Sequence, residues 1–344
     1  MMIKKRKTKS QMKIIKKNNK EAISMKKMNI IMLILGLVFI VTGCNLSITY
    51  SDTIISLDTQ IDISFRTSKN GKQALKDIKD IFKKVDKYSD NYNSHNNQSI
   101  KDLNDHREIE LNDELKPIIE AALDIKEDTN GYYNPLIGRL SKLWKNAIKN
   151  EQIVDDSIVA DELEIMNNSE IVIDGNNVKI IGDADVDLGG IAKGYATEKV
   201  HQYFIDNNIT EYLIDAGESN ILVGTRKKGY NVGFSKPFDN SLYGAMKLTD
   251  KSIGTSSPRY QSCKVGDELI HHLLSPYTGK PVNYYESVNV ICDDSMVADA
   301  YSTAIFAMDL DTLKDFVNSK GIQVIACKNS EIIYKKVDGE FEEV

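Results

Sequence analysis

The chain has 344 residues, 41% hydrophobic and 27% charged, which is ordinary for a globular protein long enough to bury a full core. Eleven of its 44 Lys/Arg but only one of its 50 Asp/Glu lie in the first 27 positions, so the remainder carries 33 basic against 49 acidic residues, a net charge of −16. A body that acidic argues against nucleic acid as a partner.

The basic head and the uncharged run after it are typical of a lipoprotein signal peptide. Met28–Gly43 has no charged residue and is short for a membrane-spanning helix. It ends in "VTGC" at Val41–Cys44, which resembles a bacterial lipobox. We therefore expect residues 1–43 to be a signal peptide and Cys44 to be lipidated, holding an extracytoplasmic protein on the membrane. An uncleaved signal anchor is the alternative.

Met25 would also make a normal signal start, so residues 1–24 could be a misassigned start or a long basic region. Residues 44–51 are expected to be a tether, and residues 52–344 one catalytic domain. Polar and apolar residues alternate over Asp52–Ser68, which predicts an opening strand.

Helices and strands then follow without regular alternation. Apolar residues at helical spacing predict helices over three segments: Lys72–Tyr88, Asp113–Thr129 and Pro135–Asn150. Between the first two, Asp90–Asp105 is rich in Asn and Ser and is expected to be a surface loop. Two short apolar runs joined by Gly-Asn-Asn predict a hairpin over Glu170–Asp183.

The second half continues in the same mixed style. Helices are predicted over Ile191–Asn207, Ser295–Met308 and Asp311–Asn318. Strands are predicted in "YLIDAG", "NILVG", "YNVGF", "AMKLTD", "KSIGTSS", "HHLLSP", "SVNVIC", "QVIACK" and "EIIYKK". This order predicts an α+β fold with mainly antiparallel sheets rather than a doubly wound parallel sheet.

The stretch "VDLGGIAKGYATEKV", Val186–Val200, predicts an anion site. Gly189 and Gly190 allow close approach of the backbone, and the predicted helix after them points its first amides into the turn. Lys193 adds a positive charge there, while Asp187 could accept hydrogen bonds from a base or ribose. A glycine-rich structural corner with a solvated lysine is the alternative.

A second constellation lies in "MVADAYSTAIFAM", where Asp299 and Thr303 are four residues apart and share one helix face. A carboxylate, a hydroxyl and a backbone carbonyl from elsewhere would form an oxygen site suited to Mg²⁺. Helix capping is the alternative reading of the two side chains. In "HHLLSPYTGKP", His272 is the histidine with a plausible chemical role, although a strand histidine is more often structural.

Cysteine spacing gives no zinc motif. With Cys44 lipidated, Cys263, Cys292 and Cys327 remain, and one disulfide is possible without the sequence choosing the pair. Buried small hydrophobic residues are the favoured interpretation.

In this order the motifs resemble the ApbE family, the flavin transferases that move FMN from FAD onto a protein. The resemblance covers roughly residues 52–335. It rests on "DLGGIAKG" at Asp187–Gly194, "GTSS" at Gly254–Ser257, "HLLSPYTGKP" at His272–Pro281, "ADAYSTA" at Ala298–Ala304, "GYYNP" at Gly131–Pro135 and "SLDT" at Ser56–Thr59. The departures from the family pattern are Leu57-Asp58, Asn134, Glu218, Ser257-Pro258 and Ser275.

The resemblance implies an ApbE-like single catalytic domain, related to the T-fold, in which Mg²⁺ would be held by the Gly190 carbonyl, Asp299 and Thr303. Lys193 would neutralise FAD phosphate and Asp187 would help to fix the nucleotide. The other implied flavin contacts are Leu57, Tyr92, Tyr132, Tyr133, Asn134 and Leu273. His272 is the candidate to assist deprotonation of the attacking hydroxyl.

FMN would pass to a Thr or Ser hydroxyl of an acceptor flavoprotein belonging to a membrane redox complex, with release of AMP. Two other functions stay open. An enzyme that hydrolyses FAD to FMN and AMP would use the same metal site, and a flavin-binding lipoprotein would have no turnover.

Overall fold

The computed structural model describes residues 47–238 and 241–344, and Ile48–Val344 form one folded unit. The expectations for residues 1–43 and for Cys44 lie outside the described residues. The helices of the described part are α2 (Gly71–Ser89), α3 (Ile100–His106), α4 (Leu115–Asp128), α5 (Gly138–Asn150), α6 (Asp156–Asn167), α7 (Ala192–Asp206), α8 (Ser295–Phe306) and α9 (Leu310–Lys320).

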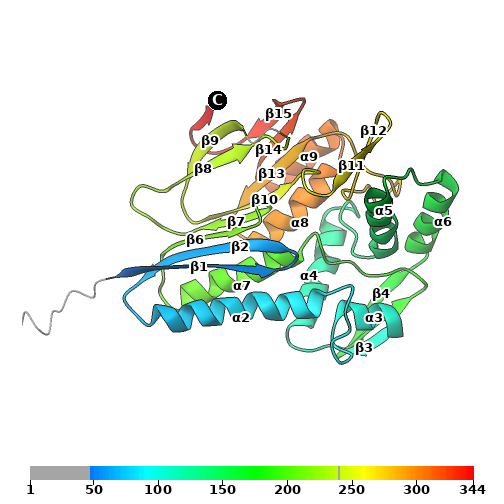
Figure 1. The fold of residues 1–344 in the computed structure, drawn as a ribbon, viewed down its shortest axis with the longest axis horizontal. Helices are drawn as coiled ribbons and strands as arrows, with labels where there is room; N and C mark the ends of the chain where they lie inside the picture. Colours follow the sequence, from blue (N-terminus) through cyan, green and yellow to red (C-terminus); the bar gives the residue numbers. More distant parts are fainter. Residues whose placement is uncertain (1–46, 239–240) are drawn as a thin grey trace, which may run out of the picture. The chain divides into compact units, whose positions relative to one another are not determined.

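An eight-stranded antiparallel sheet forms the centre of this unit (Figure 1). Its strands, in spatial order, are β1 (Ile48–Ser56), β2 (Thr59–Thr67), β6 (Glu211–Ala216), β7 (Asn220–Val223), β10 (Lys251–Ser256), β13 (Ser287–Cys292), β14 (Gln323–Lys328) and β15 (Glu331–Lys336). Helices α2, α7 and α8 pack on one face of it. The larger hydrophobic core fills the space between, with Ile63, Phe82 and Phe204 all at most 1% exposed.

A smaller sheet, ordered β16 (Phe341–Glu343), β9 (Leu242–Leu248) and β8 (Tyr230–Ser235), builds a second core. Its inward residues, including Phe234 and Met246, join Ile253, Ile291 and Ile325 of the large sheet. The large sheet is therefore buried on both faces where β10, β13 and β14 run through it, and the first five residues of β13 are all buried although two of them, Ser287 and Asn289, are polar.

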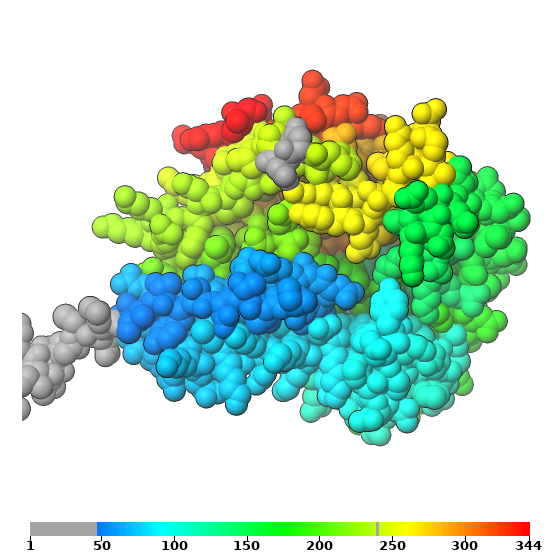
Figure 2. Space-filling view, viewed as in Figure 1, coloured from blue at the N-terminus to red at the C-terminus, as the bar shows by residue number. Residues whose placement is uncertain are grey.

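Two further small sheets complete the strands. One is ordered β3 (Glu108–Glu110), β5 (Asn177–Ile181) and β4 (Glu170–Asp174), and it contains the expected hairpin. The other pairs β11 (Ser262–Val265) with β12 (Glu268–His271). Figure 2 shows the blue β1–β2 hairpin, a yellow segment and the green helical region meeting around a hollow on one face of the molecule.

The opening strand expected over Asp52–Ser68 is wrong, because the segment is a hairpin of two strands. Leu57 and Asp58 form its two-residue turn with φ of 52° and 58°. Positive φ at both positions is the geometry of a type I′ turn, which usually carries Asn and Gly. Strand β1 begins at Ile48, so four residues of the expected 44–51 tether belong to the sheet.

The loop expected over Asp90–Asp105 is correct only as far as Ser99. The Ser99 hydroxyl caps α3 by accepting a hydrogen bond from the Asp102 amide. The Asp102 carboxylate in turn accepts a hydrogen bond from the Ser99 amide. This capping box supplies partners for the first amides of a helix only seven residues long. Ile100 and Leu103 are fully buried on its inner face.

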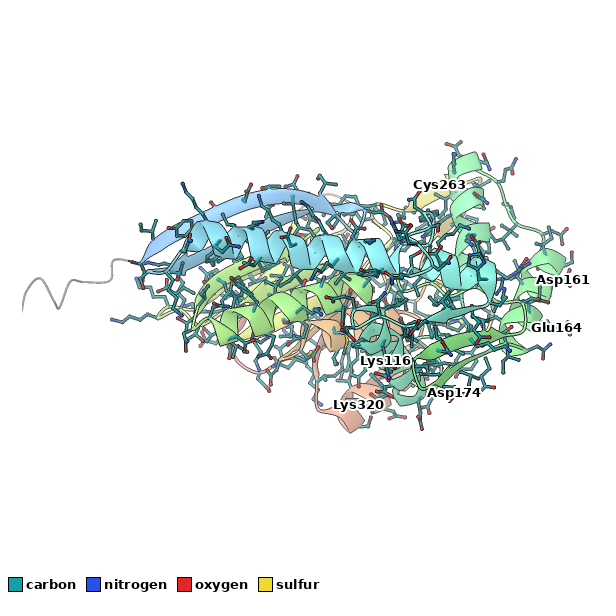
Figure 3. All side chains as sticks on the ribbon, turned by 90° about the horizontal axis from the view of Figure 1, so that it is seen from below. Lys116, Asp161, Glu164, Asp174, Cys263 and Lys320 are labelled. Carbon is teal, nitrogen blue, oxygen red and sulfur yellow. The ribbon has the colours of Figure 1, made fainter. Side chains whose placement is uncertain are left out.

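Helix α6 and the end of strand β12 also differ from the predicted elements. Helix α6 was not predicted; Asp161 and Glu164 on its outer side point away from the body, as Figure 3 shows. The strand expected in "HHLLSP" ends at His271, and the residues after it form a turn closed by the bond from the Ser275 amide to the Lys280 carbonyl. No helix within the described ranges is long and apolar enough to cross a membrane.

The fold class is nevertheless as predicted: α+β, with mixed helices and antiparallel sheets. Helices α2, α4, α5, α7, α8 and α9 lie within three residues of the predicted bounds. The amphipathic pattern of α2 buries Ile78, Phe82 and Val85 as expected.

Candidate active site

The glycine turn and the helix that carries Asp299 meet through a close helix crossing. A Cβ on Gly194, in the first turn of α7, would lie 2.5 Å from the Cβ of Asp299 and would overlap the Ser295 carbonyl. Only glycine lets the two backbones approach so closely. The crossing therefore places the start of α7 directly against α8.

One amide at the start of α7 is already occupied. The Gly194 amide is one of the first four amides of α7, which have no carbonyl partner within the helix, and it donates to Oδ2 of Asp299 at 2.8 Å. Among the described residues, no backbone amide donates to the Gly190 carbonyl. The Gly190 carbonyl, which precedes the helix, is therefore uncommitted beside the predicted metal ligands Asp299 and Thr303.

Thr303 completes this group of oxygen atoms. A Cβ on Gly190 would lie 3.1 Å from Oγ1 of Thr303, so the turn and the hydroxyl are neighbours. The Thr303 hydroxyl lies 3.4 Å from the Asp299 carbonyl and 3.5 Å from the hydroxyl of Ser256 at the end of β10. Ser256 itself bonds the Ser302 hydroxyl at 2.9 Å, which ties β10 to α8.

The Asp299 carboxylate is buried with few partners. The residue is 3% exposed, and burial raises the pKa of its carboxyl against the opposing effects of Lys193 and the Gly194 amide. A buried carboxylate with a single hydrogen bond is costly, and a bound cation would relieve that cost.

Tyr133 also faces this group with an unused polar atom. Its side chain is 4% exposed, and its hydroxyl has no hydrogen-bond partner within the described part of the chain. Burial raises the pKa of the Tyr133 hydroxyl well above its usual value, with further contributions from the charges of Asp187 and Asp299. A buried hydroxyl without a partner, close enough to two carboxylates to feel their charges, is suited to a ligand that is not part of the chain.

The residues fit a hard divalent cation. A carboxylate, a hydroxyl and a free carbonyl are the oxygen donors that Mg²⁺ takes when it keeps waters and binds phosphate. The described ranges contain no group of three or more His, Cys, Asp and Glu residues arranged for a metal. This donor set would not form such a group, because only one of its members is a carboxylate.

Asp187 and Lys193 lie on opposite sides of the glycine turn. Oδ1 of Asp187 accepts the Gly189 amide at 2.7 Å and so shapes the turn, and its Oδ2 lies 4.0 Å from Nζ of Lys145. Nζ of Lys193 reaches back over the turn to the Gly189 carbonyl at 3.4 Å. Lys145 was not among the predicted site residues.

His272 lies in the turn after β12. Its Nδ1 is 3.2 Å from the carbonyl of Gln261, which can only accept, so the bond requires the proton on Nδ1 and leaves Nε2 as the basic nitrogen. The pKa of His272 is lowered to about 4, first by burial and then by the charges of His271, Lys193 and Lys145. The imidazole is therefore neutral near pH 7.

The remaining predicted flavin contacts occupy several different segments. Tyr92 is 54% exposed on the loop before α3, and its hydroxyl accepts from Lys145 at 3.1 Å. Tyr132 packs edge-on against Tyr277 with ring centroids 4.8 Å apart. Asn134 uses its side-chain oxygen to accept the Leu136 amide in the turn that leads to α5.

Leu57 lies in the β1–β2 turn and Leu273 is buried beside His272. Of the predicted set, close contacts and strong electrostatic interactions link five residues most tightly, namely Asp187, Gly190, Asp299, Thr303 and Tyr133. They connect His272 and Tyr92 to this set through the charges of Lys193 and Lys145.

The described cysteines are unpaired, but the favoured interpretation of buried small residues is confirmed only for Cys327, because Cys263 and Cys292 are half-buried. Cys327 is fully buried, and Figure 3 shows Cys263 on the short β11–β12 ribbon at the edge of the molecule. A cavity of about 460 Å³ lies apart from the site, between β15 and the end of the chain, and is lined by Tyr243, Tyr334 and Glu343 among others.

Comparison with known proteins relates this arrangement to a family. The ApbE family matches residues 57–326. A protein of Klebsiella pneumoniae (strain 342) named "FAD:protein FMN transferase" is 26% identical over 200 residues, which cover 56% of this chain and 62% of that protein. The chain spans 62% to 66% of the length of three curated relatives that carry this name.

Solved structures share the fold. The ApbE protein from Thermotoga maritima superposes with a TM-score of 0.75 at 25% identity, covering 86% of this chain and 97% of that one. The flavin transferase ApbE from Vibrio cholerae does so with a TM-score of 0.68 at 20% identity, covering 87% and 97%. Because the family match includes the glycine turn, the His272 turn and α8, and because the whole described fold recurs in solved members, the chain belongs to the ApbE family.

Proposed function

We propose that the chain is an FAD:protein FMN transferase, which moves FMN from FAD to a hydroxyl of an acceptor protein and releases AMP. Family membership and the names of its relatives support this activity. The structural observation that carries it is the oxygen group beside the glycine turn, where buried Asp299, the Thr303 hydroxyl and the free Gly190 carbonyl lie together.

In this proposal Gly190, Asp299 and Thr303 would hold Mg²⁺. When bound, the ion would supply positive charge against the pyrophosphate of FAD and help to orient it. Lys193 would add a second positive charge from the start of α7. The observation that supports the ion itself is a buried carboxylate that has one amide donor and a raised pKa.

The reaction would be a substitution at the phosphorus of the FMN half. The acceptor oxygen, from a Thr or Ser side chain, forms a bond to that phosphorus while the bond to the bridging oxygen breaks. The bridging oxygen leaves with the electron pair as part of AMP. The proton of the acceptor hydroxyl would pass to Nε2 of His272, which its neutral form leaves available.

The other site residues would bind and enclose the nucleotide. Asp187 holds the glycine turn by accepting the Gly189 amide at Oδ1, and its other oxygen, Oδ2, would accept hydrogen bonds from the nucleotide. Tyr133 would donate its unpartnered hydroxyl to the bound ligand. Tyr92, Tyr132, Asn134, Leu57 and Leu273 would line the flavin nucleotide.

We further propose that the mature protein begins at lipidated Cys44 and acts outside the cytoplasm on the membrane surface. The basic head, the uncharged run and "VTGC" support this location. Acceptors would then be the extracytoplasmic flavoprotein domains of membrane redox complexes.

Product analysis tests the proposed function. The purified protein is incubated with FAD, Mg²⁺ and a candidate acceptor domain, and AMP, free FMN and protein-bound flavin are quantified by chromatography. Transfer predicts AMP equal to protein-bound flavin. AMP equal to free FMN, with no flavin on the acceptor, would instead identify a pyrophosphatase, and the absence of AMP would identify a binding protein without turnover.

A further inference from the structure

Lys145 joins three separate segments beside the glycine turn. It lies in the middle of α5, next to Trp144, whose indole donates to the Gly279 carbonyl at 2.7 Å and fixes that part of the helix. Nζ of Lys145 donates to the hydroxyl of Tyr92 at 3.1 Å and lies 4.0 Å from Oδ2 of Asp187. One side chain thus connects α5, the Tyr92 loop and the turn that carries Asp187.

The charges around Lys145 keep it protonated. Burial opposes its charged form, but the Asp187 carboxylate, the Tyr92 hydroxyl and the Asp58 carboxylate of the β1–β2 turn outweigh burial and raise the pKa of the ammonium group. The site therefore contains two positive charges, that of Lys145 on α5 and that of Lys193 on α7.

Both of these charges act on His272, whose pKa is lowered first by burial and then by neighbouring positive groups. The groups acting on its imidazole are the Gln261 carbonyl, His271, Lys193 and Lys145, and the last three all disfavour protonation. Lys193 is already assigned to phosphate in the proposed function. Lys145 has no such assignment, yet it contacts a flavin-lining tyrosine and the nucleotide-fixing aspartate.

We propose that Lys145 is a positioning residue of this site, which fastens Tyr92 to Asp187 across the ligand position through its contacts with both side chains. This role for Lys145 rests on the proposed function, because a neutral His272 and a fixed Tyr92 loop have a purpose only when a nucleotide binds. The contacts of Lys145 with Tyr92 and Asp187 also fix its charge within the site, and the consequence that we expect, a charge coupling between α5 and His272, is independent of any turnover.

The first experiment uses the protein without FAD. The titration of the His272 imidazole is followed by NMR, with the resonance assigned by its loss in His272→Gln. Lys145→Met, which keeps the apolar stem and removes the charge, should raise the midpoint by roughly 0.5 to 1 pH unit, the effect of one unit charge in a partly solvated site. Lys145→Arg should leave the midpoint near that of the parent.

Lys149→Met is the matched control, because Lys149 lies one turn further along the same helix and is exposed. It should not change the His272 midpoint. Lys145→Gln is a second neutral variant should the methionine variant fail to fold. A midpoint that stays unchanged in the folded neutral variant, or that moves equally in the Lys149 control, would overturn the inference.

The second experiment tests the fastening of Tyr92 by a double-mutant cycle on FAD affinity. Lys145→Met and Tyr92→Phe each break the same hydrogen bond, so the double variant should bind FAD no more weakly than the weaker single variant. Fully additive losses would show that the two side chains act separately. If the parent binds no FAD, the proposed function fails, while the NMR result still decides the charge coupling.

Discussion

Lys193 and His272 must have different charge states within one site. Lys193 must be charged to hold phosphate, and it reaches the Gly189 carbonyl over the glycine turn. His272 must be neutral to accept a proton, and its pKa of about 4 keeps it so across the physiological range. Burial is the main reason why the imidazole stays neutral, and the charge of Lys193 that favours phosphate binding adds to it, so binding and proton transfer are electrostatically linked.

Substitutions of these two side chains should therefore have different effects. Lys193→Ala should weaken FAD binding about ten- to a hundredfold, the range for losing a hydrogen bond to a charged group. His272→Ala should leave FAD affinity within about twofold and lower the transfer rate, because its proton is moved only as the hydroxyl attacks. Flavin fluorescence measures the first and single-turnover transfer the second. Parent-like FAD affinity in Lys193→Ala would show that the glycine turn is only a structural corner.

Asp102 is a residue whose charge organises a functional loop. Its buried carboxylate accepts the amides of His95, Gln98 and Ser99 at 2.9 to 3.0 Å and so holds the loop that carries Tyr92. Burial would raise the pKa of this carboxyl, but the hydrogen bonds from Ser94, His95 and Ser99 hold it far below its usual range.

Asp102→Asn should destabilise the protein by roughly 2 kcal/mol at pH 7, since the loop loses charge-assisted bonds. The folded pKa lies below the unfolded value, so this contribution is fully present above about pH 4 and is lost progressively as pH falls below it. Urea unfolding measures the free energy of unfolding of variant and parent at pH 7 and at pH 3. The difference between the two proteins should be smaller at pH 3. A gap of constant size would contradict the assignment.

At the scale of the element, the crossing of α7 and α8 positions the site. Gly194 permits the crossing, and its amide holds Asp299 in place. Gly194→Ala should force the helices apart, lower stability by at least about 1 kcal/mol and weaken Mg²⁺ binding, because overpacking against backbone cannot be relieved by a rotamer change. Thermal unfolding and Mg²⁺ titration measure the two effects.

Gly233→Ala is the control for that variant. Its Cβ would meet only the flexible side chain of Leu242 at 3.1 Å, in the small sheet away from the site. If Gly194→Ala matched this control in stability and in Mg²⁺ affinity, the crossing would not be what positions Asp299.

The sequence predicted elements best where one regular pattern decides them. The helical spacing of Ile78, Phe82 and Val85 identified α2 because those residues all face one core. The β1–β2 turn escaped prediction because Leu57 and Asp58 take positive φ without glycine or asparagine. Helix α3 escaped because its capping box lies within a polar run, where composition alone favours a loop.

The candidate site was predictable as a set of residues but not as a geometry. Spacing on one helix placed Asp299 and Thr303 together, since four residues make about one turn. It could not show that Gly194 would donate to Asp299, or that Gly190 would lie against Thr303, because both depend on the packing of α7 on α8. Lys145 was missed for the same reason, as its partners come from distant segments.

At the scale of the whole molecule, the proposed cleavage before Cys44 would separate a basic N-terminal segment from an acidic domain. The first 27 residues hold eleven of the 44 basic residues, whereas the rest is strongly acidic. An acidic domain is repelled by anionic lipid, so attachment to the membrane should depend on the anchor rather than on charge.

Cys44→Ala should therefore move the protein from the membrane fraction to the soluble fraction or leave an unprocessed precursor. Fractionation followed by mass spectrometry of the N-terminal peptide in the native host measures this. The parent should show a lipid adduct on an N-terminal cysteine. A native chain that retains residues 1–43 with an unmodified Cys44 would contradict the proposed processing.

The most direct test of the proposed function is the mass of an acceptor domain after incubation with the purified protein, FAD and Mg²⁺. The account predicts an added FMN on one Thr or Ser, dependent on Mg²⁺, and at least a hundredfold slower transfer by Asp299→Asn, which keeps the shape of the buried side chain but removes its charge. Equal modification by Asp299→Asn in limiting Mg²⁺, or FAD turned over with no FMN on any acceptor, would contradict it.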